Sequence, residues 1–487
     1  MRWTAKALLA IVLMSSPARA QDAAACFSAQ PDPAAKIAAC TKGLASTPES
    51  SRALAHLARA EAYAATGNIR SALADYNDAL ALNAHDAPAF LARGKLHEAI
   101  GDATKAEADY TAALTEDRAL AEAYARRGAL RLAHGVTDAA LADLNEARRL
   151  DPSDAATQRL FADTRLKGGQ GGDAAAGYTA ALAANPTDAA ALRGRATASA
   201  RAGDYAKAIT DFSAALALNA KDVAAREGRG MALLQSGALA EAVADFSTLA
   251  TLRPGDPSPL FFRANAKLQS GDAVGANEDF SVFLTAHPAD GEALMGRALA
   301  RQFSGDHRGA DADLTAILSL APDAAQPLAQ RGYVRLMLGE FSAAATDLAR
   351  AAVLPNTPPE VSLWRFIAET RAGHKGEPAL AAAAKTAPKT QWPGPVFAYF
   401  LGAASGDDVL AAANQGPVGE LRHLPERLCE AYFYLGEAAL IVKDTAEAAR
   451  LFKAAVATGM RRYTEYAAAQ AELARLGPSK LDKVVKP

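Results

Sequence analysis

The chain has 487 residues, which is too long for one compact core and indicates either several domains or one elongated array. Its formal net charge of −2, with both signs scattered along the sequence, argues against the basic footprint of a nucleic-acid-binding protein. Half of the residues are hydrophobic and 6% are aromatic, and the many alanines favour helices that pack closely through small side chains.

Residues 1–20 are typical of a secretory signal peptide. Arg2 and Lys6 precede a short apolar run, and an Ala-x-Ala cleavage pattern ends at Ala20. We therefore expect cleavage after Ala20, a mature chain that begins at Gln21, and a periplasmic location.

A lipoprotein anchored through Cys26 is the alternative. Residues 22–25 read Asp-Ala-Ala-Ala and lack the leucine-containing box that lipoprotein processing uses. No stretch approaches the roughly 20 apolar residues of a membrane-spanning helix, so we expect no transmembrane segment.

Residues 21–52 are expected to form a helical N-terminal cap. Cys26 and Cys40 lie on either side of a proline-containing loop, and export to an oxidising compartment favours a disulfide between them. Cys429 lies in an aromatic helical run and is interpreted as a buried apolar residue, the alternative being a reactive thiol.

A residue pattern returns every 34 positions from residue 53 to residue 358, in nine uninterrupted units. Each unit holds a glycine, an alanine five residues later, and a bulky apolar residue four residues after the alanine; a second small residue stands seven positions before the glycine. The glycines are Gly67, Gly101, Gly135, Gly169, Gly203, Gly237, Gly271, Gly305 and Gly339. Glycine ends the first helix of each unit in a left-handed conformation, and the small residues let two helices approach.

This pattern resembles the tetratricopeptide repeat family. The resemblance implies an all-α fold, namely a right-handed superhelical solenoid of antiparallel helix pairs, in which each apolar stripe is buried only by stacking. It also implies that the chain binds other proteins or peptides in a concave groove.

Eight of the nine units contain an arginine just before the small residue of the first helix and an aspartate 16 positions later. The pairs are Arg59 and Asp75, Arg93 and Asp109, Arg127 and Asp143, Arg195 and Asp211, Arg229 and Asp245, Arg263 and Asp279, Arg297 and Asp313, and Arg331 and Asp347. The unit at residues 155–188 lacks both, with Phe161 and Gly177 in their places. This joint loss predicts an ion pair within each of the other units, because either partner alone would leave a partly buried charge.

The exceptional unit also contains the glycine-rich run 167–172. A phosphate-binding loop is rejected there, because no strand precedes it and no Gly-Lys-Ser/Thr follows it. The glycines are expected to lie in the turn between two helices and to make this unit a hinge.

One face of each first helix corresponds to unit positions 2, 5, 9 and 12, which are neighbours by helical spacing. In the family this face lines the concave groove. In the later units it is a mostly apolar strip suited to an extended or helical peptide, formed by Met231, Leu234, Phe261, Asn265, Leu268, Met295 and Tyr333. The alternative is that these residues only pack the superhelix.

The strict period fails after residue 358. Residues 359–424 are expected to form degenerate helical units, residues 425–477 a C-terminal helical module with a capping helix, and residues 478–487 a disordered basic tail. The run Tyr-Leu-Gly at 434–436, the segment 451–456 and the later Glu-Tyr and Glu-Leu pairs resemble the end of tetratricopeptide lipoproteins of the NlpI type. That resemblance implies a periplasmic adaptor, in some cases a homodimer, that brings a protease or peptidoglycan hydrolases to their targets.

No catalytic motif, metal-ligand spacing or cofactor motif is found in the sequence, so no catalytic residue, metal or cofactor is assigned. Three hypotheses follow. The chain is a periplasmic scaffold or adaptor, a structural component of an envelope or secretion complex, or an enzyme with a cryptic site.

Overall fold

The computed structural model describes residues 25–28, 32–45, 47–387, 391–415 and 424–477. In these residues all regular structure is helical, which confirms the all-α prediction. The predicted signal peptide, its predicted cleavage site and the predicted basic tail lie outside the described residues.

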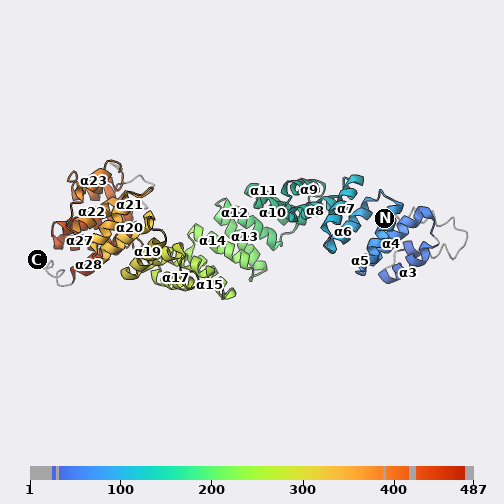
Figure 1. Ribbon diagram of the computed structural model, residues 1–487, viewed down its shortest axis with the longest axis horizontal. Helices are drawn as coiled ribbons and strands as arrows, with labels where there is room; N and C mark the ends of the chain where they lie inside the picture. Colours follow the sequence, from blue (N-terminus) through green and yellow to red (C-terminus); the bar gives the residue numbers. More distant parts are fainter. Residues whose placement is uncertain (1–24, 29–31, 46, 388–390, 416–423, 478–487) are drawn as a thin grey trace. The chain divides into compact units, whose positions relative to one another are not determined.

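The chain divides into two compact units, Met1–Ala225 and Arg226–Pro487. Consecutive helices of the first unit pack as antiparallel neighbours (Figure 1). They are α3 (Pro33–Leu44), α4 (Glu49–Ala65), α5 (Ile69–Leu82), α6 (Ala87–Ala99), α7 (Ala103–Glu116), α8 (Ala121–Ala133), α9 (Thr137–Leu150), α10 (Ala155–Lys167), α11 (Gly171–Ala184), α12 (Ala189–Arg201) and α13 (Tyr205–Leu218). The boundary between the units falls in α14 (Val223–Ser236).

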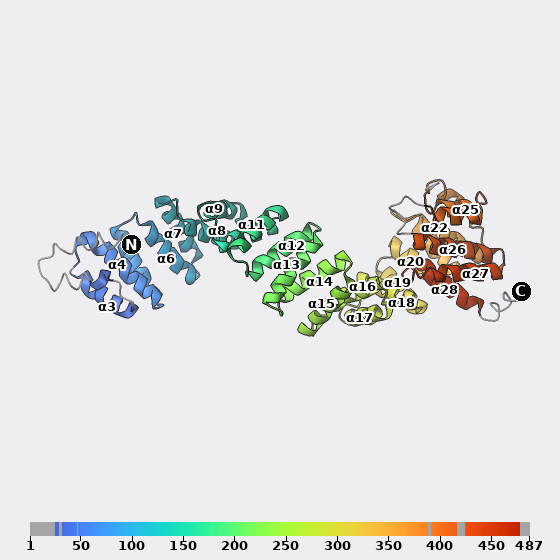
Figure 2. The same ribbon diagram turned by 180° about the vertical axis from the view of Figure 1, so that it is seen from behind.

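The second unit continues the helix pairs and then departs from them (Figure 2). The regular pairs end with α15 (Leu239–Leu252), α16 (Ser258–Ser270), α17 (Ala273–Ala286), α18 (Gly291–Phe303), α19 (His307–Leu320), α20 (Ala325–Leu338) and α21 (Phe341–Ala352). The remaining helices are α22 (Glu360–Arg371), α23 (Glu377–Ala383), α24 (Gly394–Phe400), α25 (Gly406–Ala413), α26 (Leu424–Ile441), α27 (Thr445–Ala457) and α28 (Thr464–Leu476). The short helices α23 to α25 lie in the part predicted to be degenerate.

Local signals set the helix boundaries. Aspartate side chains accept backbone N–H groups at many helix starts, as Asp102 does for α7 and Asp204 for α13. All nine recurrent glycines have positive φ, from 73° at Gly67 to 92° at Gly271, which confirms that they end the first helices.

The small-residue columns allow the close packing that the sequence predicts. The alanines at the recurrent position, from Ala72 to Ala344, are 0% exposed. A Cβ on Gly94 would lie 2.7 Å from Tyr110 Cε1, and one on Gly332 would lie 2.5 Å from Leu348 Cγ. The bulky residue therefore fills the space that the small residue leaves.

The predicted disulfide between Cys26 and Cys40 is confirmed, and it joins the segment before α3 to α3 itself. Asp32 begins α3 by accepting the N–H groups of Ala34 and Ala35. Cys429 is 0% exposed, and burial raises the pKa of its thiol to about 12, which agrees with an unreactive core residue.

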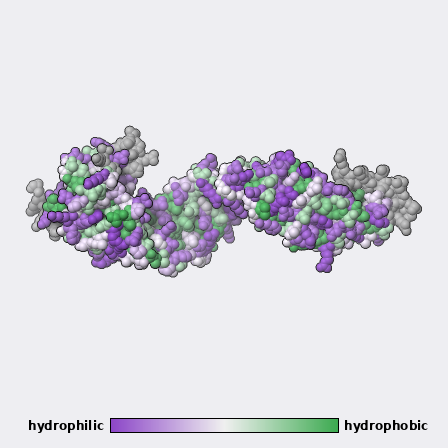
Figure 3. All heavy atoms as spheres, turned by 45° about the horizontal axis from the view of Figure 1, so that its top comes forward, coloured by the Kyte–Doolittle hydropathy of each residue, from purple (hydrophilic) through white to green (hydrophobic). Residues whose placement is uncertain are grey.

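No helix in the described ranges is long and apolar enough to cross a membrane. On the face drawn in Figure 3, hydrophobic and hydrophilic residues are interspersed along each unit. Large apolar side chains are instead concentrated in the core of the C-terminal helices, around Trp364, Phe433, Tyr434 and Phe452.

Candidate protein-binding groove

The arginine and aspartate columns form a ladder of buried ion pairs. Arg331 Nε lies 2.7 Å from Asp347 Oδ2 and Nη2 lies 2.8 Å from Oδ1. The same two contacts recur in the other seven pairs. Arg331 Nη1 also donates to Thr315 Oγ1, 3.2 Å away in the preceding repeat. The predicted pairing is confirmed, and it ties neighbouring repeats together.

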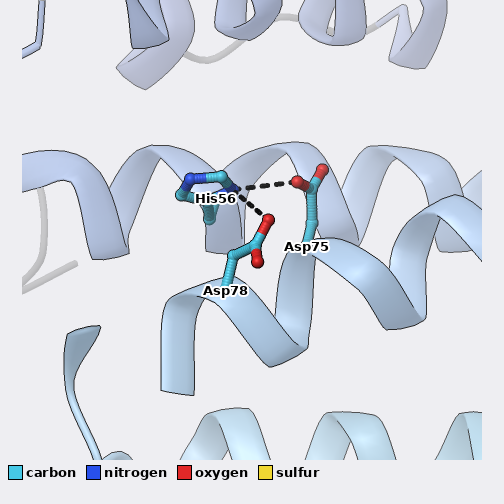
Figure 4. A group of neighbouring side chains, drawn as sticks. All are labelled: His56, Asp75 and Asp78. Atoms are coloured by element: carbon cyan, nitrogen blue, oxygen red, sulfur yellow. Dashed lines mark hydrogen bonds and ion pairs between the residues drawn. The ribbon is translucent and has the colours of Figure 1, made fainter. Parts of the chain in front are cut away.

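His56, Asp75 and Asp78 form a cluster that invites a metal assignment (Figure 4). His56 Nδ1 lies 2.9 Å from Asp75 Oδ1 and 3.7 Å from Asp78 Oδ2. Both oxygens of Asp75 already accept from Arg59 at 2.7 Å, and that guanidinium opposes a second cation. Arg226 takes the place of His56 beside the aspartate of its own repeat, at 3.0 Å. The cluster therefore belongs to the ladder.

The exceptional unit replaces the ion pair by cation–π contacts. The guanidiniums of Arg148 and Arg165 both lie near the Phe161 ring, with Cζ atoms 3.9 Å and 5.1 Å from the ring centroid. A Cβ on Gly177 would lie 2.9 Å from Ala162 Cβ, so this glycine permits a close helix approach. The two substitutions are thus compensated locally.

Residues 168–170 separate α10 from α11, and Gly171 and Gly172 open α11. This placement agrees with an inter-helix turn, although two of the glycines lie inside the second helix. A cavity of about 910 Å³ lies beside them. Its basic residues bind within the chain: Arg195 to Asp211, Arg201 to the Leu166 carbonyl, and Lys207 to Asp204. The cavity therefore supplies no free cation for a phosphate.

Alanine at Gly171 and Gly172 is expected to stabilise this unit by roughly 0.5–1 kcal/mol per substitution. A Cβ on Gly171 would meet nothing nearer than the Ala198 carbonyl oxygen at 4.0 Å, and one on Gly172 meets nothing within 4 Å. Gly169 has φ +77°, so Gly169→Ala is the matched control that should destabilise. Hydrogen exchange across residues 155–188 measures both effects. Equal protection of this unit and its neighbours in the unmodified chain would contradict the predicted hinge.

The predicted groove residues lie on the first helices of the second unit. Met231 and Leu234 lie on α14, Phe261, Asn265 and Leu268 on α16, Met295 on α18, and Tyr333 on α20. Leu234 is buried at 8% exposure, whereas the other six are partly exposed. Leu234 therefore contributes mainly to the core.

Phe261 is the best-supported contact residue of this strip. Its ring centroid lies 5.1 Å from that of Phe283 and 5.9 Å from that of Phe280, so the side chain is held in place while part of it faces solvent. Leu268 and Met295 pack against the same cluster. Asn265 Nδ2 donates to the Phe261 carbonyl at 3.0 Å. These residues form a preformed, mostly apolar surface.

Tyr333 has a different environment. Its ring centroid lies 4.6 Å from that of Trp364, which is 1% exposed, and Glu465 of α28 acts electrostatically on its hydroxyl. Burial raises the pKa of Tyr333. Tyr333 therefore packs with the C-terminal core, and only part of its side chain stays exposed.

Helix α28 lies against α18 and α20, on the groove side of the array. Gln302, at position 12 of the α18 repeat, donates from Nε2 to Thr464 Oγ1 at 3.4 Å. At the other end of α28, Arg475 Nη2 donates to the carbonyls of Leu336 and Met337 at 3.2 Å and 2.6 Å. A cation at the C-terminal end of α20 is favourable because the helix dipole is negative there.

A buried ionic group fastens α28 toward its C-terminal end. Arg371 of α22 lies 2.7 Å from Glu437 of α26 and 3.5 Å from Glu472 of α28. Arg475 also pairs with Glu472, and the Arg371 guanidinium lies 4.4 Å from the Phe341 ring centroid. Burial raises the pKa of Glu437. The neighbouring Glu472 carboxylate raises it further by charge repulsion.

Sequence reasoning did not identify Gln302, Glu465, Glu472 or Arg475 as groove residues. The alanine-rich run 464–476 predicts a helix, and the helix is present. Nothing in it indicates that the helix returns to a repeat 139 residues earlier.

The family model described as "Tetratricopeptide repeat" matches residues 57–121, 159–218 and 200–257. A solved tetratricopeptide repeat protein from Parabacteroides merdae is 20% identical, with 51% of this chain and 98% of that chain covered and a TM-score of 0.38. The C-terminal part of a repeat protein from Cytophaga hutchinsonii is 18% identical, with 47% and 94% covered and a TM-score of 0.40. YrrB, a TPR protein with an unusual peptide-binding site, is 20% identical, with 40% of this chain and 98% of that chain covered and a TM-score of 0.37.

The family match agrees with the 34-residue period, the paired helices and the left-handed glycine at each turn. Residues 57–121 and 159–257 of the chain are therefore similar to tetratricopeptide repeats.

Proposed function

We propose that this protein is a periplasmic scaffold that binds other proteins through the strip at Phe261, Asn265, Leu268 and Met295. The observation that carries the proposal is the partly exposed ring of Phe261, which is braced by Phe280 and Phe283 and packs against the same core cluster as Met295. Aromatic and methionine side chains held on a rigid surface are typical anchors for a helical or extended peptide.

The periplasmic location is part of the proposal. The N-terminal signal pattern supports it, and so does the disulfide between Cys26 and Cys40, because disulfides persist in oxidising compartments. The C-terminal resemblance to lipoproteins of the NlpI type motivates a protease or peptidoglycan hydrolases as partners, with homodimerisation as a further property. These identities stay predictions.

Glutamate at Phe261 and at Met295 is expected to reduce partner capture at least tenfold, because loss of one buried aromatic anchor costs about 2 kcal/mol or more. The measurement is capture from periplasmic extract by the tagged full-length chain, with quantification of each bound protein. The matched controls are Val274→Glu and Val282→Glu on α17, whose side chains are 61% and 51% exposed.

Capture that is equally strong in F261E, M295E and the controls would contradict the groove. Assembly into a large envelope complex that these substitutions do not disturb would favour the structural-component hypothesis. Absence of the tagged chain from the periplasmic fraction would contradict the location.

A further inference from the structure

Helix α28 occupies positions that a groove ligand would take. It contacts Gln302 at position 12 of α18, lies over α20 near Tyr333 at position 9, and places Glu465 near Glu360 at position 2 of α22. Positions 9 and 12 are occupied by the strip residues Asn265 and Leu268 in the repeat of α16, and position 2 belongs to the same predicted helix face. The site filled by α28 is therefore the C-terminal continuation of the same groove.

The helix is held by polar contacts at its ends and by small side chains along its face. Ala467, Ala468 and Ala469 are 4%, 1% and 0% exposed, and each alanine buries little apolar area. Thr464 fastens one end, and Glu472 with Arg475 fastens the other. Tyr466 and Leu476, each 8% exposed, add larger apolar contacts to this interface.

The fit of α28 is incomplete. Glu437 Oε1, the Tyr434 hydroxyl and Glu360 Oε2 are buried in the described part of the chain without a hydrogen-bond partner. Glu437 shares Arg371 with Glu472 of α28, and Glu465 of α28 acts electrostatically on the Tyr434 hydroxyl. Buried polar atoms without partners favour any helix that can supply the missing donors or acceptor.

We propose that the groove of α18, α20 and α22 is a binding site for an amphipathic helix of a partner protein, and that α28 is its built-in occupant, which the partner displaces. The partner helix carries a hydroxyl at its first turn, small residues on the contacting face, a carboxylate opposite Arg371 and a cation at its C-terminal end. The inference rests on the proposed function and extends it to this part of the groove.

The tether is short, since six residues separate the end of α27 at Ala457 from the start of α28 at Thr464. A short tether gives an intramolecular ligand an effective concentration on the order of 1 mM, so α28 competes strongly with any external helix. Weakening α28 without altering the groove should therefore increase the affinity for an external helix.

The test uses the full-length chain and a fluorescently labelled synthetic peptide of residues 463–476. Arg475→Gln removes the contacts to the Leu336 and Met337 carbonyls but leaves every groove residue in place. The labelled peptide is expected to bind R475Q about tenfold more tightly than the unmodified chain, from the loss of charge-assisted hydrogen bonds in the internal competitor. A labelled peptide that itself carries the R475Q substitution is expected to bind about tenfold more weakly than the unmodified peptide.

Thr464→Val is a second variant of the occupant, and a gain in peptide affinity is expected there too. Arg450→Gln is the matched control, because Arg450 lies on α27 in an exposed pair with Glu447. Equal peptide affinity for the unmodified chain, R475Q and T464V, or no saturable binding to any of them, would overturn the inference and make α28 a fixed cap. Capture that depends on Phe261 and Met295 would then still support the proposed function, so the two failures are distinguishable.

Discussion

Replacing Asp347 by alanine is expected to lower the free energy of unfolding of its repeat by about 3–5 kcal/mol. Asp347 is 2% exposed and accepts from Arg331 at 2.7 Å and 2.8 Å and from Arg335 at 2.8 Å. Arg335 keeps a second partner, Asp311 at 2.7 Å, whereas Arg331 loses its carboxylate. The cost is therefore mainly the stranded, largely buried guanidinium of Arg331.

Hydrogen exchange of α20 and α21 measures this loss locally, because each repeat of a solenoid is stabilised mainly by its neighbours. The matched control is Asp323→Ala, whose pair with Arg350 is exposed and should cost less than about 1 kcal/mol. The double variant R331M/D347L should recover most of the loss, because it leaves no charge unpaired at that position. A D347A loss no larger than that of D323A would contradict the structural role of the ladder.

Raising the pH from 5 to 8.5 is expected to destabilise the C-terminal helices by roughly 4 kcal/mol. Glu465 of α28 is 9% exposed, and burial raises its pKa from 4.5 to about 8. Glu430 of α26 has its pKa raised to about 7, also chiefly by burial. Several groups on the surrounding helices interact electrostatically or by hydrogen bonds with these two carboxyls. They are Glu360, Trp364, Trp392, Glu426, Arg427 and the hydroxyls of Tyr333 and Tyr434.

The direction follows from the raised pKa. Below pH 4.5 both carboxyls are protonated in the folded and unfolded states, and their contribution to stability is complete. As the pH rises, the unfolded state ionises first, and the contribution is lost through pH 7 to 8. Asp408 acts oppositely, because the Ser405 hydrogen bonds lower its pKa, but its contribution is lost only as the pH falls below 3.8. The pH range in which Asp408 affects stability therefore does not overlap with that of Glu430 and Glu465.

Urea unfolding followed by tryptophan fluorescence measures this prediction, since Trp364 and Trp392 both lie beside these carboxyls. Trp392 Nε1 donates to Glu430 Oε2 at 2.6 Å. Glu465→Gln keeps the shape and removes the charge, so it should flatten the pH dependence while preserving α28. Stability that rises with pH, or an E465Q chain with the same slope as the unmodified chain, would contradict the assignment.

Much of the array could be predicted because its contacts recur at short, fixed separations. Three features repeat in the units: a glycine at the turn, a small residue opposite a bulky one, and an arginine 16 residues before an aspartate. Because the same feature recurs, the interpretation of one unit can be checked against the others. The replacement of both partners in one unit, by Phe161 and Gly177, supports the inference that arginine and aspartate pair in the other units. The disulfide between Cys26 and Cys40 was predictable because the two cysteines are only 14 positions apart in the sequence.

The groove could be predicted only in part. Helical spacing placed Phe261, Leu268 and Met295 on one face, but it could not show that Leu234 is buried or that Tyr333 packs against Trp364. The contact between Gln302 and Thr464 spans 162 residues and belongs to no repeat. His56 likewise gives no signal in sequence that distinguishes a ladder residue from a metal ligand.

The sequence by itself determined the repeat, the helix pairs and the ion-pair ladder, because neighbouring units in a solenoid interact through residues at constant spacing. Only the tertiary structure decided that α28 returns to the groove and that Arg475 caps the end of α20. That docking depends on the combined shape and charge of α18, α20, α22 and α26, which no local pattern encodes.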